Sequence, residues 1–108
     1  MPPAVYSVLL LVVIYPILEE FVFRGGVQRY LYEKPSLRQS LLGLSLANVI
    51  TSMLFAAIHL INQPPLWAAL VFFPSLVFGW ARDRYDHIVA SIVLHGFYNA
   101  GFIYLFSA

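Results

Sequence analysis

The chain contains no cysteine and little charge, and each shortage excludes a class of protein or site. Without cysteine there is no disulfide, no thiolate metal site and no thiol nucleophile. Charged residues make up 10% of the 108 residues and hydrophobic residues 61%, whereas a water-soluble domain carries roughly 25% charged residues. The net charge of +1 gives no basis for a nucleic acid or a strongly acidic partner. The composition therefore predicts a polytopic membrane protein.

Several kinds of segment are also missing. The start, MPPAVYSVLL, has no basic residue before its apolar run, and that run ends in acids instead of a small-residue cleavage site. No cleavable signal peptide is therefore expected. No internal repeat, low-complexity tract or long linker divides the sequence. We expect a single domain over residues 1–108.

Charged residues and prolines divide the sequence into four apolar blocks. They run from Ala4 to about Gln28, from about Gly43 to Ile61, from Leu66 to Ala81 and from Ile88 to Phe106. A helix needs about 20 residues to span a bilayer, at about 1.5 Å per residue. The expected fold is all-α, a polytopic membrane protein built as a bundle of four transmembrane helices.

The first block raises the question of where its helix ends. Its uncharged part, Ala4 to Leu18, covers only about 22 Å of a hydrocarbon core of roughly 30 Å. To span the core, this helix has to continue through Glu19 and Glu20 into the sequence FVFRGG. The two carboxylates are therefore predicted to lie at membrane depth, where ionisable side chains are rare and mark functional sites.

The basic residues predict how the chain is oriented in the membrane. The loops after the first and third blocks carry lysine and arginine, whereas the loop INQPP and both termini carry none; the basic residues are Arg29, Lys34, Arg38, Arg82 and Arg84. Basic loops remain on the cytoplasmic side. We expect an integral protein of a bacterial inner membrane with both termini non-cytoplasmic.

Six polar residues inside or next to the apolar blocks are candidates for a site: Glu19, Glu20, Arg24, His59, His95 and Asn99. Residues four apart share a helix face, so Glu20 can pair with Arg24, and His95 shares a face with Asn99. Glu19 lies about 100° around the helix from Glu20 and has no obvious partner on its own helix. Glu19 is therefore the candidate general base.

Each of these residues alone has a structural explanation. Glu20 and Arg24 can form an ion pair that fixes helix packing, and a single histidine or Asn99 can be a hydrogen-bonded packing residue. Two carboxylates, two histidines and an amide on three apolar helices exceed what packing requires, so the set favours a functional site. His87, in RDRYDHIV at the expected interface, is interpreted as solvated and left out of this site.

The depth of His59 is harder to reconcile with the other candidates. Glu20 and His95 both lie about 13 Å from the cytoplasmic helix ends, but His59 lies about 31 Å in if its helix begins at Arg38. We therefore predict that PSLRQSLLG lies along the cytoplasmic interface and that INQPP is recessed below the outer surface.

Three short motifs occur in order on successive apolar segments. EEFVFR fits the pattern EExxxR, FAAIH fits FxxxH and HGFYN fits HxxxN. In this order the chain resembles the CPBP family of intramembrane proteases, which includes the eukaryotic CAAX prenyl endopeptidases and bacterial Abi-type relatives. The resemblance implies hydrolysis of a peptide bond in a membrane-associated peptide or protein. In the glutamic-protease view of the family, the acid pair falls on Glu19 and Glu20, and Glu19 and His59 activate water. The same view assigns stabilisation of the oxyanion to His95 and Asn99.

The residues leave metal dependence open. If Glu20 is held by Arg24, the possible ligands are Glu19, His59 and His95, and three ligands plus a water molecule is a pattern of catalytic zinc. No HExxH helix places two ligands four residues apart. The favoured prediction is a site with no metal and no cofactor, and zinc is the alternative.

Other functions are compatible with parts of this pattern. His59 and His95 can be axial haem ligands, although a haem explains neither the glutamates nor Asn99. A non-catalytic membrane immunity or scaffold protein can keep the same fold, and four short helices leave little room for a proton-coupled transporter. The sequence does not determine the substrate, whether the substrate is prenylated, or whether the chain forms a homo-oligomer.

Overall fold

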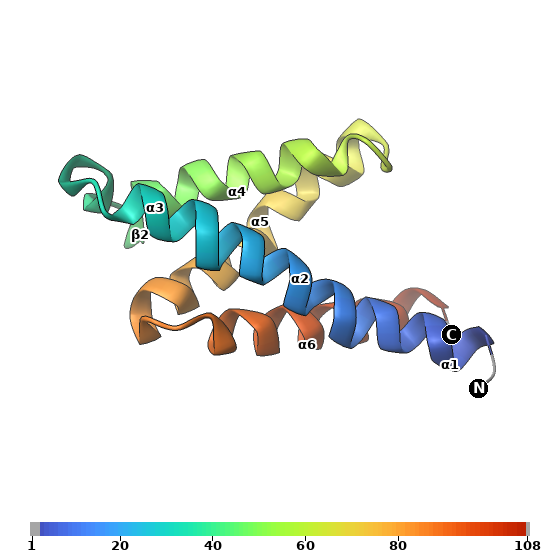
Figure 1. The fold of residues 1–108 in the computed structure, drawn as a ribbon. Coiled ribbons are helices and arrows are strands. Elements are labelled where there is room, and N and C mark those ends of the chain that lie inside the picture. Colours follow the sequence, from blue (N-terminus) through green and yellow to red (C-terminus); the bar gives the residue numbers. More distant parts are fainter. Residues whose placement is uncertain (1–2, 108) are drawn as a thin grey trace.

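The computed structural model describes residues 3–107, which are almost entirely helical (Figure 1). One continuous helix, called helix 1 below, is made of α1 (Pro3–Leu9), the π-helical segment η1 (Leu10–Ile14), α2 (Tyr15–Val22), the π-helical segment η2 (Phe23–Gln28) and α3 (Arg29–Tyr32). Glu19 and Glu20 lie inside α2. The prediction that the first helix continues through both glutamates is confirmed.

A short connection separates helix 1 from the next helix. The 3₁₀ turn η3 (Pro35–Arg38) leads into an antiparallel hairpin in which β1 (Ser40–Leu41) pairs with β2 (Leu44–Ser45). The turn residues Leu42 and Gly43 both have positive φ, 56° and 82°, as a two-residue type I′ turn requires. The expectation of a helix from about Gly43 is wrong, because this turn occupies the position.

Helix α4 (Leu46–His59) is short for a membrane helix. The Ser45 hydroxyl caps its N-terminus by accepting a hydrogen bond from the Asn48 N–H, which satisfies a donor that the first turn leaves free. Its 14 residues give a length of about 21 Å, compared with roughly 30 Å for a hydrocarbon core. As predicted, the helix does not begin at Arg38. It ends at His59, two residues before the expected end at Ile61.

Two long helices complete the described fold. Helix α5 (Pro65–Tyr85) begins with a proline, contains Pro74, and ends at Asp86, whose φ of 53° is left-handed; such a residue stops a helix. Helix α6 (Ile88–Ser107) follows directly. Within the described chain, three helices are long and apolar enough to cross a membrane: Ala4–Tyr32, Pro65–Tyr85 and Ile88–Phe106. The all-α membrane class is confirmed, with α4 as the shorter fourth apolar helix.

The helices pack so that their polar side chains face inward. α5 packs against both α4 and α6, and helix 1 lies against α4 and α6 (Figure 1). Large apolar side chains such as Phe21, Phe73 and Phe97 are exposed, whereas most of the large side chains that are fully buried are polar, among them Arg24, Gln28, Glu20, Asn48 and Thr51. Lipid provides little force for burying apolar surface, so small and polar residues mediate contact between helices. The polar interior between the helices is therefore the candidate location of the site.

Candidate functional site

A buried ion pair on helix 1 lies at the centre of the bundle. The side chains of Glu20 and Arg24 are both 0% exposed, and Arg24 Nη1 donates to Glu20 Oε2 at 3.1 Å. The pairing predicted from their spacing of four residues is confirmed. Arg24 lies in η2, and π-helical turns inside α-helices are frequent at functional sites.

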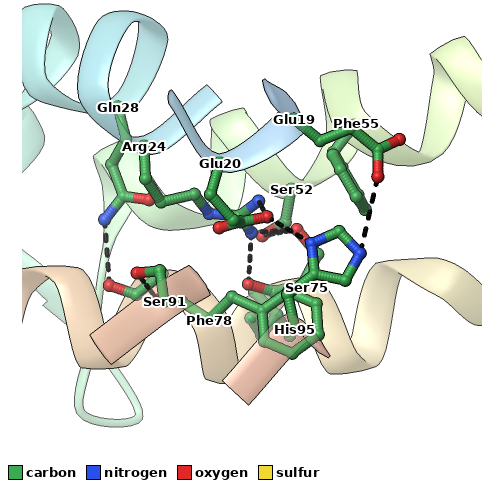
Figure 2. Close-up of polar contacts among 12 residues, drawn as sticks. Glu19, Glu20, Arg24, Gln28, Ser52, Phe55, Ser75, Phe78, Ser91 and His95 are labelled. Atoms are coloured by element: carbon green, nitrogen blue, oxygen red, sulfur yellow. Dashed lines mark hydrogen bonds and ion pairs between the residues drawn. The ribbon is translucent and has the colours of Figure 1, made fainter. Parts of the chain in front are cut away.

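Arg24 also connects helix 1 to α4 and α5. Its Nη2 donates to the carbonyl oxygen and the Oγ of Ser75 (Figure 2). The guanidinium carbon lies 5.0 Å from the ring centroid of Phe55 on α4 and 5.7 Å from that of Phe78 on α5. Charge-assisted hydrogen bonds and cation–π contacts stabilise a cation that is removed from water. Arg24 therefore stabilises the positions of three helices at once.

His95 bridges the two glutamates from α6. Its Nδ1 lies 2.8 Å from Glu20 Oε2, and its Nε2 lies 3.5 Å from Glu19 Oε1 (Figure 2). A carboxylate oxygen accepts, so His95 Nδ1–H donates to Glu20. The ring of Phe78 stacks on the imidazole with centroids 4.7 Å apart. His95 is thus fixed on one nitrogen, and its other nitrogen faces Glu19.

Glu19 lies at the open side of this cluster. Its side chain is 34% exposed, compared with 6% for His95 and 0% for Glu20. The expectation that Glu19 has no partner on its own helix holds, but α6 supplies one in His95. A carboxylate that contacts an imidazole and is open to its surroundings can accept a proton from a water molecule.

His59 reaches the cluster through Phe55. The Phe55 ring contacts both histidines, with its centroid 4.7 Å from that of His59 and 5.8 Å from that of His95. His59 Nδ1 lies 2.7 Å from the Phe55 carbonyl oxygen. A carbonyl oxygen only accepts, so Nδ1 carries the proton and Nε2 of the neutral ring has the free lone pair. His59 is half-buried, and this second nitrogen can accept a proton.

Asn99 is directed toward a different part of helix 1. It lies one turn beyond His95 on α6, and its Nδ2 donates to the carbonyl oxygen of Leu11 at 2.8 Å. His87 is exposed, as expected. The structure therefore brings four predicted residues into direct contact, places His59 one aromatic ring away and leaves Asn99 at a separate contact; the four are Glu19, Glu20, Arg24 and His95.

A polar network that was not predicted from the sequence continues from Arg24 along the interface of helix 1 and α5. The two helices run in the same direction, and partners lie 51 residues apart: Arg24 bonds to Ser75, and Gln28 Nε2 donates to the Gly79 carbonyl at 3.0 Å. A signal for it was present as polar or small residues spaced by four on each helix: Glu20, Arg24 and Gln28 on helix 1, and Ser75, Gly79 and Asp83 on α5.

Helix α4 adds a row of hydroxyl and amide groups to this network. Ser75 Oγ donates to Ser52 Oγ at 2.9 Å, and Ser52 Oγ donates to Asn48 Oδ1 at 3.1 Å. At the other end of the interface, Ser45 Oγ donates to Asp83 Oδ2 at 2.6 Å. Buried hydrogen bonds of this kind satisfy polar groups that neither lipid nor apolar side chains can satisfy.

The three side chains considered as ligands in the zinc alternative, Glu19, His59 and His95, do not form a group that could hold a metal ion. Within residues 3–107, no group of three or more His, Asp or Glu side chains is arranged to hold a metal ion. Glu20 Oε2 is occupied by Arg24 and His95, and His59 Nδ1 by a backbone carbonyl. Glu19, His59 and His95 therefore do not fit a zinc site in this geometry.

A match to a known protein family covers nearly the whole chain. A family model described as type II CAAX prenyl endopeptidase Rce1-like matches residues 1–101. No curated protein and no solved structure matches the chain. The matched segment includes every candidate residue from Glu19 to Asn99.

Proposed function

Because the chain belongs to the Rce1-like family of type II CAAX prenyl endopeptidases, we propose that it is a glutamic intramembrane endopeptidase. It hydrolyses a peptide bond of a membrane-associated peptide or protein. The difference between the two adjacent glutamates is the observation that carries the proposal. Glu20 is held by Arg24 and His95 with no exposed surface, whereas the side chain of Glu19 is 34% exposed. One carboxylate is fixed, and the other is available as a base.

In this proposal Glu19 and His59 activate a water molecule. Glu19 accepts a proton from the water, and His59 presents Nε2 as an acceptor because its Nδ1–H is directed at a backbone carbonyl. The resulting hydroxide attacks the scissile carbonyl carbon. When the tetrahedral intermediate collapses, the C–N bond breaks and the leaving amine takes up the proton that Glu19 accepted from the water. General-base catalysis of this kind contributes about 10²–10⁴-fold to the rate.

His95 and Asn99 stabilise the oxyanion that forms in this attack. Asn99 has two amide hydrogens, and the Leu11 carbonyl engages one of them, so the other is available for the developing O⁻. His95 donates a hydrogen bond to the oxyanion through Nε2 while that nitrogen is protonated, and the proton on Nε2 comes from Glu19. Removing one such donor typically costs about 10²–10³ in rate. Glu20 supports the step by holding His95 Nδ1.

The proposed reaction uses no metal ion and no cofactor. Arg24 neutralises the Glu20 carboxylate, a charge that a cation would otherwise balance. The oxyanion is stabilised by N–H donors in place of a Lewis acid. The proposal also places both termini outside the cytoplasm, since the basic residues gather at the C-terminal ends of helix 1 and α5 and in the turn that follows helix 1.

A cleavage assay tests the proposal. The chain is reconstituted in liposomes with a farnesylated peptide that ends in Cys-aliphatic-aliphatic-X or with its unprenylated counterpart, and mass spectrometry detects the released tripeptide. Glu19→Gln and His59→Ala should each lower the rate by about 10²–10⁴-fold. Glu33→Gln removes a carboxylate that is exposed and distant from the cluster, and it should cleave at the wild-type rate.

Three results would contradict parts of the proposal. Equal rates for wild type and Glu19→Gln would remove the assigned base. Loss of activity with a chelator, restored by zinc, would favour the zinc alternative. A folded wild-type chain that cleaves neither peptide would favour the non-catalytic immunity or scaffold protein.

A bis-histidine haem site is not favoured by the geometry. Both ring nitrogens of His95 face carboxylate oxygens, at 2.8 Å for Glu20 and 3.5 Å for Glu19, so neither nitrogen is directed toward an iron atom. A Soret band in the purified protein would contradict this conclusion.

A further inference from the structure

Pro16 interrupts the hydrogen bonding of helix 1 one turn before the glutamates. At the end of η1 a backbone N–H bonds to the carbonyl five residues back, from Tyr15 to Leu10. The next donor in this register would belong to residue 16, and proline has no N–H. The Leu11 carbonyl therefore lacks its partner along the helix. In an ordinary α-helical register the carbonyl without a partner would be that of Val12.

Both of these carbonyls face α6. Asn99 Nδ2 donates to the Leu11 oxygen at 2.8 Å. Gly96 approaches so closely that a Cβ atom built on it would lie 2.7 Å from the Val12 oxygen. A carbonyl at membrane depth needs a donor, because lipid supplies none. Asn99 supplies that donor from another helix, and the absence of a side chain at Gly96 allows the two backbones to approach.

His95 lies between these contacts in the sequence, immediately before Gly96 and four residues before Asn99. Any rotation or displacement of α6 at the two contacts therefore also moves the His95 ring. A small movement of the ring breaks one of its two contacts, since its Nδ1 lies 2.8 Å from Glu20 Oε2 and its Nε2 lies 3.5 Å from Glu19 Oε1.

We propose that the Leu11 carbonyl freed by Pro16 and the neighbouring Val12 carbonyl form a docking point for α6, and that this docking point positions the His95 ring between the two glutamates. Pro16 and Gly96 are positioning residues in this scheme, because neither of them contacts Glu19 or the reacting atoms. The effect on activity rests on the proposed peptidase function, whereas the docking itself can be measured without a substrate.

A double-mutant cycle in reversible unfolding tests the docking. Asn99→Leu has a similar volume and no N–H donor, so in the chain with Pro16 it should raise the unfolding equilibrium constant by about tenfold. Pro16→Ala restores an N–H that can bond the freed carbonyl. Adding Asn99→Leu to Pro16→Ala should therefore change the unfolding constant by about twofold or less. Equal effects in the two backgrounds would overturn the docking point.

A pair of glycine substitutions tests the positioning of His95. Gly96→Ala forces α6 away from the Val12 carbonyl, and it should lower kcat on the order of 10²-fold with KM changed by about twofold or less. Gly101→Ala is the matched control on the same helix, since a Cβ atom there meets nothing within 4 Å, and its kcat should stay within about twofold of wild type. A normal kcat for Gly96→Ala would overturn the positioning role.

Pro16→Ala covers the case in which Gly96→Ala does not fold. Alanine is the better helix former, so helix 1 should remain intact while kcat falls and KM does not. Normal kinetics for this variant would also overturn the positioning role. If the unfolding effects are coupled but the wild-type chain cleaves no peptide, the docking point stands and the peptidase function falls. If the chain cleaves peptides but the unfolding effects are additive, the peptidase function stands and the docking point falls.

Discussion

Glu19 and Glu20 are neighbours in the chain, yet their carboxylates lie in opposite surroundings. Glu20 accepts from both Arg24 and His95 and has no exposed surface, whereas Glu19 contacts His95 at 3.5 Å and is 34% exposed. The cause is the helix itself, since successive residues point about 100° apart. Two adjacent acids in one motif therefore have two different surroundings: Glu20 is a fixed partner for a buried cation, and Glu19 is a partly exposed carboxylate.

The largest expected effect separates the two glutamates by activity. Glu19→Gln should lower the cleavage rate by about 10²–10⁴-fold while the free energy of unfolding changes by about 0.5 kcal/mol or less, because the side chain is partly exposed. Cleavage kinetics and denaturant unfolding of the same preparation measure both quantities. A large loss of stability in Glu19→Gln would mean that Glu19, like Glu20, is needed for the fold.

The next effect concerns the stability of the closed half of the site. Arg24→Met keeps a long side chain but leaves Glu20 buried without its cation, and breaking a buried ion pair typically costs about 3–5 kcal/mol. The free energy of unfolding should fall by about that amount. Arg29→Met, at an exposed position one helical turn further along, should have little effect. Equal stabilities for the two variants would mean that the buried pair is not a structural element.

A smaller effect tests how closely the helices approach around the polar network. A Cβ atom at Gly79 would lie 1.9 Å from Asn48 Oδ1, so Gly79→Ala should displace that side chain and lower the free energy of unfolding by about 1–3 kcal/mol. The nearest atom to a Cβ atom at Gly26 is 4.0 Å away, and Gly26→Ala should be neutral or slightly stabilising. Thermal unfolding of both variants decides the matter; a stable Gly79→Ala protein would contradict the tight approach.

The smallest effect distinguishes a residue that is only buried from one that belongs to the network. Thr51 is 0% exposed, and within the described residues its Oγ1 has no hydrogen-bond partner. Thr51→Val removes an unsatisfied hydroxyl, so stability should be unchanged or higher by about 1 kcal/mol. Ser52→Ala, one residue later, breaks two hydrogen bonds and should lower it by about 1–3 kcal/mol. A Ser52→Ala variant that unfolds at the wild-type temperature in a thermal-shift measurement would mean that the network contributes nothing.

The parts of the site that sequence predicted correctly depend on one helix at a time. The pairing of Glu20 with Arg24 follows from their spacing on helix 1. The continuation of helix 1 through both glutamates follows from the length that a spanning helix needs. The contact of His95 with Glu19 was not predicted, because it depends on how α6 lies against helix 1.

Contacts between helices were missed for an identifiable reason. The bond from Arg24 to Ser75 requires the register between helix 1 and α5, and no feature within either helix gives that register. The start of α4 was misplaced because the turn at Leu42 and Gly43 is set in an apolar sequence, LLGL, that lacks the usual polar turn residues. The partner of Asn99 depends on the π-helical register of η1, which the sequence does not reveal.

The row of hydroxyls that runs from Arg24 has a consequence for the movement of protons. Two serines, Ser75 and Ser52, are hydrogen-bonded one after the other, which is the arrangement of a proton wire. Neither end of this arrangement can exchange a proton. Arg24 cannot release a proton, and the Asn48 amide oxygen, which accepts the Ser52 hydrogen, does not take one up. Both hydroxyl hydrogens therefore point away from the guanidinium, and no proton passes along the two serines. In the proposed reaction, the protons and water that Glu19 consumes or releases therefore have to be exchanged through its exposed side, where its side chain is 34% exposed, and not through the polar interior behind Glu20.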